Sequence, residues 1–188
     1  MLGIKIYIVR FEGVEEKILE YIREGVEESI RGGICEIIDD ILELPTKAYN
    51  SLRGQYLSEL LLEEVSKYAL KLSPESGTKY IVLGVADVDI YSPGMNFIFG
   101  LAQCPGRAAL ISLFRLRPEF YGDEPNQDLF LERALKEAVH EIGHTLGLKH
   151  CKNQFCVMFF SLHIGMTDRK SRFFCDNCIK SIRDIFAR

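Results

Sequence analysis

The sequence lacks the features that mark several broad classes of protein. No apolar run approaches the roughly 20 residues that a membrane-spanning helix requires, so we expect no membrane partner. The net charge is only −4, which gives no electrostatic reason to expect nucleic acid as a partner. No internal repeat or low-complexity segment is present. With 188 residues and 47% apolar content, the chain suits a single globular domain with at most a small appendage.

A secretion signal is missing as well. Lys5 lies inside the first apolar run, and no small-residue cleavage site follows, which is typical of a strand rather than a signal peptide. We therefore expect a cytoplasmic location. We also expect the protein to be a monomer. Because the first strand begins at once, we also expect no inhibitory pro-segment. In a reducing compartment, the six cysteines favour metal binding over disulfides.

Apolar periodicity predicts an α/β fold. Residues 3–11 and 34–43 have the pattern of strands, and residues 15–31 between them repeat apolar side chains at helical spacing. Gly32 and Gly33 should end this helix. A strand, a helix and a strand of these lengths form a right-handed crossover with parallel strands.

The middle of the chain continues this alternation. A broad apolar face predicts a helix over residues 55–71, and a continuous apolar run predicts a buried strand within 79–90. Residues 96–103 and 107–116 should form a hairpin around the Pro-Gly turn between them. A long helix should then begin after the N-cap residue Asn126 and reach about residue 146.

The end of this long helix carries the most informative motif. His140 and His144 are four residues apart, so a helix presents both imidazoles on one face, with Glu141 beside them. This is the His-Glu-x-x-His pattern of zinc hydrolases, with Glu as the general base. His150 can join as a third ligand only if the chain turns sharply, and Gly147 suits that turn. Three solvated histidines are the alternative, but three of the four histidines fall in this window.

The following residues extend the motif. The full pattern is His-Glu-x-x-His-x-x-Gly-x-x-His-Cys-x4-Cys-x-Met, and then Cys-x-x-Cys. It resembles the archaemetzincin family, a branch of the metzincin zinc peptidases. The segment from Gly84 to Gly100 is also similar to that family, so the resemblance covers nearly the whole chain.

The resemblance implies a compact, metzincin-like (zincin) domain of the α/β class. It should have a mixed twisted sheet, an antiparallel edge strand, an active-site helix and a small C-terminal subdomain stapled by a four-Cys zinc site. We expect a single catalytic domain over 1–188. Its N-terminal subdomain would comprise residues 1–147, and its C-terminal subdomain residues 148–188.

The resemblance also places substrate beside the edge strand, assigned to residues 97–102. An extended peptide can add there as a further strand, because an edge strand has unpaired N–H and C=O groups. Phe99, Gly100 and Leu101 would then contact substrate, and the small Gly100 and Ala102 would let its backbone come close. A plain hydrophobic edge is the alternative.

Three histidines leave a fourth zinc position for water, which is the arrangement of a catalytic site. Zinc lowers the pKa of that water to about 7, and Glu141 would take its proton and pass it to the leaving amine. A zinc-dependent peptidase is therefore the function we expect, with a peptide or protein as substrate. An aminopeptidase of the same chemistry is one alternative, and a non-catalytic zinc-stabilised module that binds peptide or nucleic acid is another.

Met158 is expected to support the three histidines, as a methionine does in metzincins. Some metzincins place a Tyr two residues later as a donor to the oxyanion, but this chain has Phe160, which cannot donate and would line an apolar pocket. His163 is a candidate for the missing donor, and an ordinary surface histidine is the other interpretation.

Cysteines form a second predicted metal site. Two short-spaced pairs across a loop are typical of a four-thiolate structural zinc site, which would give two zinc ions per chain. Two disulfides or free thiols are the alternative. The proposed ligands are Cys151, Cys156, Cys175 and Cys178. The other two cysteines, Cys35 and Cys104, lie in apolar stretches and are predicted to be small buried hydrophobes.

Overall fold

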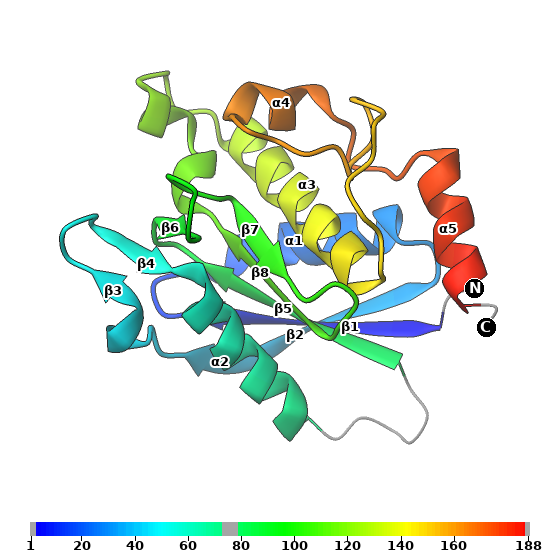
Figure 1. The fold of residues 1–188 in the computed structure, drawn as a ribbon, viewed down its shortest axis with the longest axis horizontal. Coiled ribbons are helices and arrows are strands. Elements are labelled where there is room, and N and C mark those ends of the chain that lie inside the picture. The colour runs from blue at the N-terminus through cyan, green and yellow to red at the C-terminus, as the bar shows by residue number, and fades with distance from the viewer. Residues whose placement is uncertain (1–2, 73–78, 187–188) are drawn as a thin grey trace.

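The computed structural model describes residues 3–72 and 79–186, which form an α/β fold around one mixed, twisted sheet (Figure 1). The strand order is β2-β1-β5-β8-β7. Parallel pairing joins β2, β1, β5 and β8, whereas β7 is an antiparallel edge on β8. The expected mixed sheet with an antiparallel edge strand is therefore confirmed. The strands are β1 (Ile4–Phe11), β2 (Gly33–Leu42), β5 (Lys79–Ala86), β7 (Gly100–Ala102) and β8 (Ala108–Ser112).

Helices cover both faces of the sheet (Figure 1). On one face, α1 (Glu16–Ser29) and α3 (Gln127–Thr145) share a core with the sheet. On the other face, α2 (Ser58–Lys71) packs against the same strands. Both faces are covered, and β5 is accordingly buried from Tyr80 to Ala86, as its apolar run predicts. The predicted β1-α1-β2 crossover with parallel strands is confirmed.

The prediction of a helix from residue 55 is wrong by three residues. Residues Gln55–Leu57 form β4, which pairs with β3 (Tyr49–Asn50) and β6 (Ile90–Tyr91) in a small second sheet. The N–H of Tyr56 donates to the carbonyl oxygen of Asp89 at 2.8 Å. This long-range pairing overrides the helical periodicity of the segment. The 3₁₀ helices are η1 (Thr46–Ala48), η2 (Phe114–Leu116) and η3 (Pro118–Tyr121).

The edge strand is also shorter than predicted. Before Gly100, the backbone turns to other partners: the N–H of Ile98 donates to the carbonyl oxygen of Ile90, and the carbonyl oxygen of Asn96 accepts from the side chain of Gln55. The residues that pair with β8 as a strand are Gly100–Ala102, and the carbonyl oxygen of Phe99 still accepts from the N–H of Ser112. The segment before the edge strand is thus held by the small sheet.

The prediction that Cys104 is buried is wrong. Its side chain is exposed, whereas Cys35 is buried as expected. Cys104 lies in the β7–β8 turn, and its thiol donates to the carbonyl oxygen of Leu148 at 3.4 Å. This turn lies against the end of α3, where the N–H of Gly106 donates to the carbonyl oxygen of Thr145, and Cys104 faces the cleft there instead of the core. All six cysteines are free thiols.

The C-terminal part of the chain packs beside α3. Helix α4 (Ile164–Arg169) lies against the N-terminal half of α3, and α5 (Asp176–Phe186) lies near the opposite end (Figure 1). Phe174, Cys178 and Ile182 are buried in the core that α1 and α3 share. In the described ranges, every helix is too short or too polar to cross a membrane.

The N-cap of α3 gives a test of the fold. The side-chain oxygen of Asn126 accepts from the N–H of Leu129 at 3.0 Å. We expect Asn126→Ala to lower the free energy of unfolding by about 1 kcal/mol and the melting temperature by about 2–4 °C. Asn126→Ser keeps an acceptor and should retain most of the stability. Thermal unfolding followed by circular dichroism measures both, and an unchanged Ala variant would show that the cap contributes nothing.

Candidate functional site

Helix α3 ends in the turn that the motif predicts. Gly147 has a left-handed φ of +94°. Its N–H donates to the carbonyl oxygen of His144 at 2.8 Å, and the N–H of Leu148 donates to that of Gly143 at 3.1 Å. These two bonds form a Schellman motif, which satisfies carbonyl groups at the helix end. The turn sends the chain back past the helix and brings His150 to the other two histidines.

The three imidazoles converge. The Nε2 atom of His144 lies 3.2 Å from the Nε2 atoms of His140 and His150. His140 is buried, His144 is half-buried and His150 is exposed, so the cluster opens on one side. Burial lowers the pKa of all three side chains, which favours the neutral imidazoles that a metal ion requires.

Backbone carbonyl groups set the ring tautomers. The Nδ1 atom of His140 lies 2.7 Å from the carbonyl oxygen of Val157, and that of His144 lies 2.7 Å from the carbonyl oxygen of Leu148. A carbonyl oxygen only accepts, so each Nδ1 carries the proton and each Nε2 presents a lone pair to the cluster.

These residues fit a zinc ion. Zinc–nitrogen bonds of about 2.0–2.1 Å in a tetrahedron place the nitrogens about 3.3 Å apart, close to the 3.2 Å separations found. Without a cation between them, converging lone pairs would repel one another. Three ligands also leave one position open, as in catalytic zinc sites.

Glu141 lies beside the histidines and is almost fully buried, at 5% exposure. Burial raises the pKa of its carboxyl group well above the usual range, and the nearby Glu137 raises it further. Gly100 of the edge strand packs directly on it: a Cβ atom at Gly100 would lie 2.7 Å from Cγ and Oε1 of Glu141. The space at Gly100 is therefore filled by Glu141. The close approach of a substrate backbone at Gly100 stays a prediction.

Met158 is fully buried and packs against the active-site helix. A Cβ atom on Gly143 would lie 2.3 Å from its Sδ atom, so the methionine occupies the space that this glycine leaves. The carbonyl oxygen of Met158 accepts from the N–H of Cys151 at 2.8 Å. Met158 thus connects α3 to the chain after His150. The role of Gly143 has no signal in the sequence, because it depends on this long-range contact.

A cleft of about 470 Å³ runs between the edge strand and the histidines. The predicted substrate-contacting residues Phe99, Gly100, Leu101 and Phe160 all line it, together with the three histidines and Glu141. The ring of Phe160 lies against that of His150, with centroids 4.6 Å apart. His163 is exposed and does not line the cleft, so the structure favours the surface interpretation for it. Glu137, Lys149 and Cys104 also line the cleft and were not predicted to do so.

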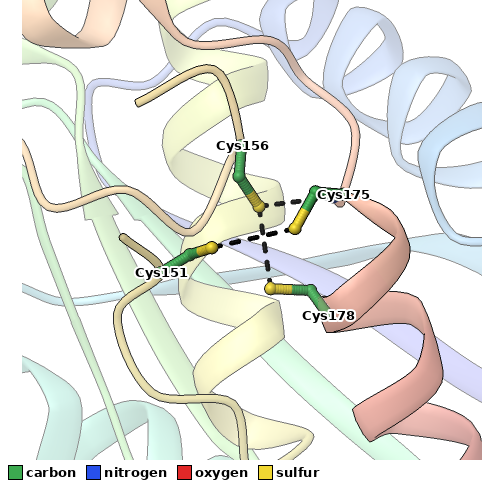
Figure 2. A group of neighbouring side chains, drawn as sticks. All are labelled: Cys151, Cys156, Cys175 and Cys178. Carbon is green, nitrogen blue, oxygen red and sulfur yellow. Dashed lines mark hydrogen bonds between the residues drawn. The ribbon is translucent and has the colours of Figure 1, made fainter. Parts of the chain in front are cut away.

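The four predicted cysteine ligands form a second cluster, with their sulfur atoms pointing toward one another (Figure 2). The Sγ atoms of Cys151 and Cys175 are 3.7 Å apart, as are those of Cys156 and Cys178. Zinc–sulfur bonds of about 2.3 Å in a tetrahedron place the sulfurs about 3.8 Å apart, so the cluster also fits a zinc ion. All four positions are filled by protein, which is typical of a structural site.

The two clusters share a short segment of chain. Val157, whose carbonyl oxygen orients His140, lies between Cys156 and Met158. His150 immediately precedes Cys151. Residues of one cluster are thus adjacent in sequence to groups that shape the other. Among the described residues, these are the two clusters with three or more metal-binding side chains.

Known proteins are similar to this chain in sequence. Residues 3–184 match the family described as Peptidase family M54. An archaemetzincin from Methanocaldococcus jannaschii is 46% identical over 171 residues, which cover 91% of this chain and 88% of that protein. An archaemetzincin from Pyrococcus furiosus is 41% identical over 186 residues, which cover 97% of this chain and 94% of that protein.

Solved structures share the fold as well. The crystal structure of archaemetzincin from Methanopyrus kandleri has a TM-score of 0.80 and 36% identity, covering 100% of this chain and 97% of that one. The structure of archaemetzincin from Archaeoglobus fulgidus, complexed with malonate, has a TM-score of 0.76 and 38% identity, covering 94% and 98%. The converging histidines, the thiolate cluster and these matches lead to one conclusion. The chain belongs to the archaemetzincin family, peptidase family M54, and is a zinc metallopeptidase.

Proposed function

We propose that the protein hydrolyses peptide bonds at the three-histidine site, with Glu141 as the general base. The observation that carries this proposal is the convergence of three Nε2 lone pairs beside a buried carboxyl group in an open cleft. His140, His144 and His150 would hold the catalytic zinc ion. Met158 supports them through its contact with Gly143.

A zinc ion held there would polarise the substrate carbonyl and lower the pKa of a water molecule to about 7. The residues of the chain transfer the protons and orient the ligands. Glu141 takes the proton from water and returns it to the leaving amine, a transfer that its raised pKa suits. The carbonyl groups of Val157 and Leu148 keep two imidazoles in the required tautomer.

The cleft favours an extended peptide with apolar side chains. The edge strand β7 leaves one side unpaired among the described strands, which supports strand addition by substrate. Phe99, Leu101 and Phe160 give the cleft an apolar lining, so Phe should be preferred over Asp after the scissile bond. Phe160 stands where some metzincins have the tyrosine donor, so the metal ion or another group would stabilise the oxyanion.

The thiolate cluster would hold a second, structural zinc ion, which gives two per chain. It staples residues 148–188 to the end of α3, so we propose a single catalytic domain in which residues 1–147 and 148–188 are subdomains. Four reduced thiols favour a reducing, cytoplasmic compartment. A monomer is sufficient, because one chain supplies the cleft and both clusters.

The role of Glu141 is tested by Glu141→Gln, which keeps the shape of the side chain and removes the base. We expect kcat on a peptide library, profiled by mass spectrometry, to fall at least about 100-fold, with zinc content unchanged. Glu132→Gln, on the same helix but outside the cleft, is the matched control and should cleave like wild type. Identical products and rates from both variants would remove Glu141 from the mechanism.

Zinc stoichiometry tests the two metal sites. Elemental analysis should find two zinc atoms per wild-type chain and one in His144→Ala. Cys175→Ser should also lose one and should unfold at a lower temperature, because the metal contributes folding free energy. Cys35→Ala removes a buried thiol outside both clusters and should keep two. A wild-type protein with one zinc, or a Cys175→Ser variant with two, would contradict the proposal.

Gly100→Ala tests the packing on Glu141. The added Cβ would overlap the carboxylate and the carbonyl oxygen of Leu110, both 2.7 Å away. Displacing the base by about 1 Å should lower kcat roughly 100-fold, while elemental analysis still finds two zinc atoms. Gly165→Ala, on α4, is the control and should retain wild-type kcat. Full activity in Gly100→Ala would show that the base tolerates displacement.

A further inference from the structure

Glu137 is an unexpected member of the cleft. The charged residues that line the cleft in the described part of the chain are Glu137, Glu141 and Lys149. The rest of the lining is largely apolar. Glu137 is also 97% buried, with 3% exposure. A buried carboxylate in an apolar wall is costly unless it has partners, so its contacts are informative.

One oxygen of Glu137 makes both of its protein contacts. Oε1 accepts from the hydroxyl of Thr167 at 3.0 Å and lies 2.9 Å from Nζ of Lys170, whose side chain is fully buried. These contacts fix the rotamer of Glu137 and offset the cost of burying its charge. They leave Oε2 without a hydrogen bond from the described residues, on a side chain that lines the cleft.

The attachment of α4 to α3 does not explain why a carboxylate is buried at position 137, because other residues already make that attachment. Arg133 already makes two hydrogen bonds to Asp168, at 2.6 and 2.8 Å. Lys136 donates to the carbonyl oxygens of Thr167 and Asp168, at 3.3 and 3.1 Å. Neither Arg133 nor Lys136 lines the cleft. Glu137 therefore differs from Arg133 and Lys136 because its side chain lines the cleft.

Its position defines what part of a substrate it reaches. Glu137 lies one helical turn before Glu141, about 6 Å along the axis of α3. An extended peptide advances about 3.3 Å per residue. A substrate group that contacts Glu137 is thus within about two residues of the bond that Glu141 helps to cleave.

We propose that Glu137 is a specificity-determining residue that binds an ammonium group of the substrate within two residues of the scissile bond. A carboxylate oxygen only accepts hydrogen bonds, and its bonds to ammonium groups are stronger than those to neutral donors. The other carboxyl group in the lining is Glu141, the proposed general base, and the remainder of the lining is largely apolar. The ammonium group belongs either to the N-terminus or to a lysine side chain. This inference rests on the peptidase activity proposed above.

Matched peptides distinguish the two sources. One arm compares a peptide that has a free N-terminus near the scissile bond with its N-acetylated form. The other compares lysine with norleucine, within two residues of the bond, in N-acetylated peptides. In one arm we expect kcat/KM to favour the ammonium group about 10-fold or more, mainly through KM. No preference in either arm, with the neutral peptides still cleaved, overturns the role of Glu137 and leaves the peptidase proposal intact. If zinc-loaded protein cleaves no peptide, both proposals fail.

Variants connect the preference to Glu137. Glu137→Gln alone leaves the buried ammonium group of Lys170 without its ionic partner, and that variant can fail to fold. The double variant Glu137→Gln with Lys170→Met therefore removes both charges. It should lose the ammonium preference, so that the ratio of kcat/KM between each ammonium peptide and its neutral partner falls to about one. Glu132→Gln should keep the preference. A double variant that still prefers the ammonium peptide overturns the proposal.

Binding gives a readout without catalysis. In a Glu141→Gln background, calorimetry with the favoured peptide and its neutral partner should show about a 10-fold difference in Kd. Adding the Glu137→Gln and Lys170→Met changes should abolish that difference. An equal Kd for the two peptides before those changes are added would contradict the proposed contact.

Discussion

The orientation of the histidines depends on two backbone carbonyl groups. Those of Leu148 and Val157 accept from Nδ1 of His144 and His140, so both Nε2 lone pairs face the same point. Neither carbonyl belongs to the helix that carries the imidazoles. Leu148 is placed by the turn at Gly147, and Val157 by the segment that leads out of Cys156. The ligand geometry therefore requires both the helix end and the chain beyond it.

Burial along α3 requires that its polar side chains find hydrogen-bonding or ionic partners. From Arg133 to Glu141, the helix is buried on nearly every side and carries several polar groups. Each such group needs a partner, because an unpaired buried charge costs several kcal/mol. Residues 167–170 supply partners for Arg133, Lys136 and Glu137. Among the described residues Glu141 has no such partner and packs on Gly100 instead, which suits the proposed role of its carboxyl group as the general base.

The sequence predicts those features that depend on local spacing. Helical periodicity places His140 and His144 on one face, Gly147 ends the helix, and the cysteine spacing anticipates the cluster around Cys175. The antiparallel edge strand follows from family resemblance. Other features depend on contacts between segments that are distant in sequence. The packing of Gly100 on Glu141, the ion pair of Glu137 with Lys170 and the exposure of Cys104 have no local signal.

A zinc ion bound by the thiolate cluster, as proposed, would act on the histidine site as well as on stability. Between Gly147 and α4 the described chain has no helix or strand of its own, so its path depends on side-chain contacts and on a staple. The same chain supplies His150, the carbonyl of Val157 and the buried Met158. Because Cys151 and Cys156 flank these groups, fixing the sulfurs also fixes the positions from which the catalytic site is completed. A fold of this size can thus build a precise metal site partly on an irregular segment, provided that a second metal restrains that segment.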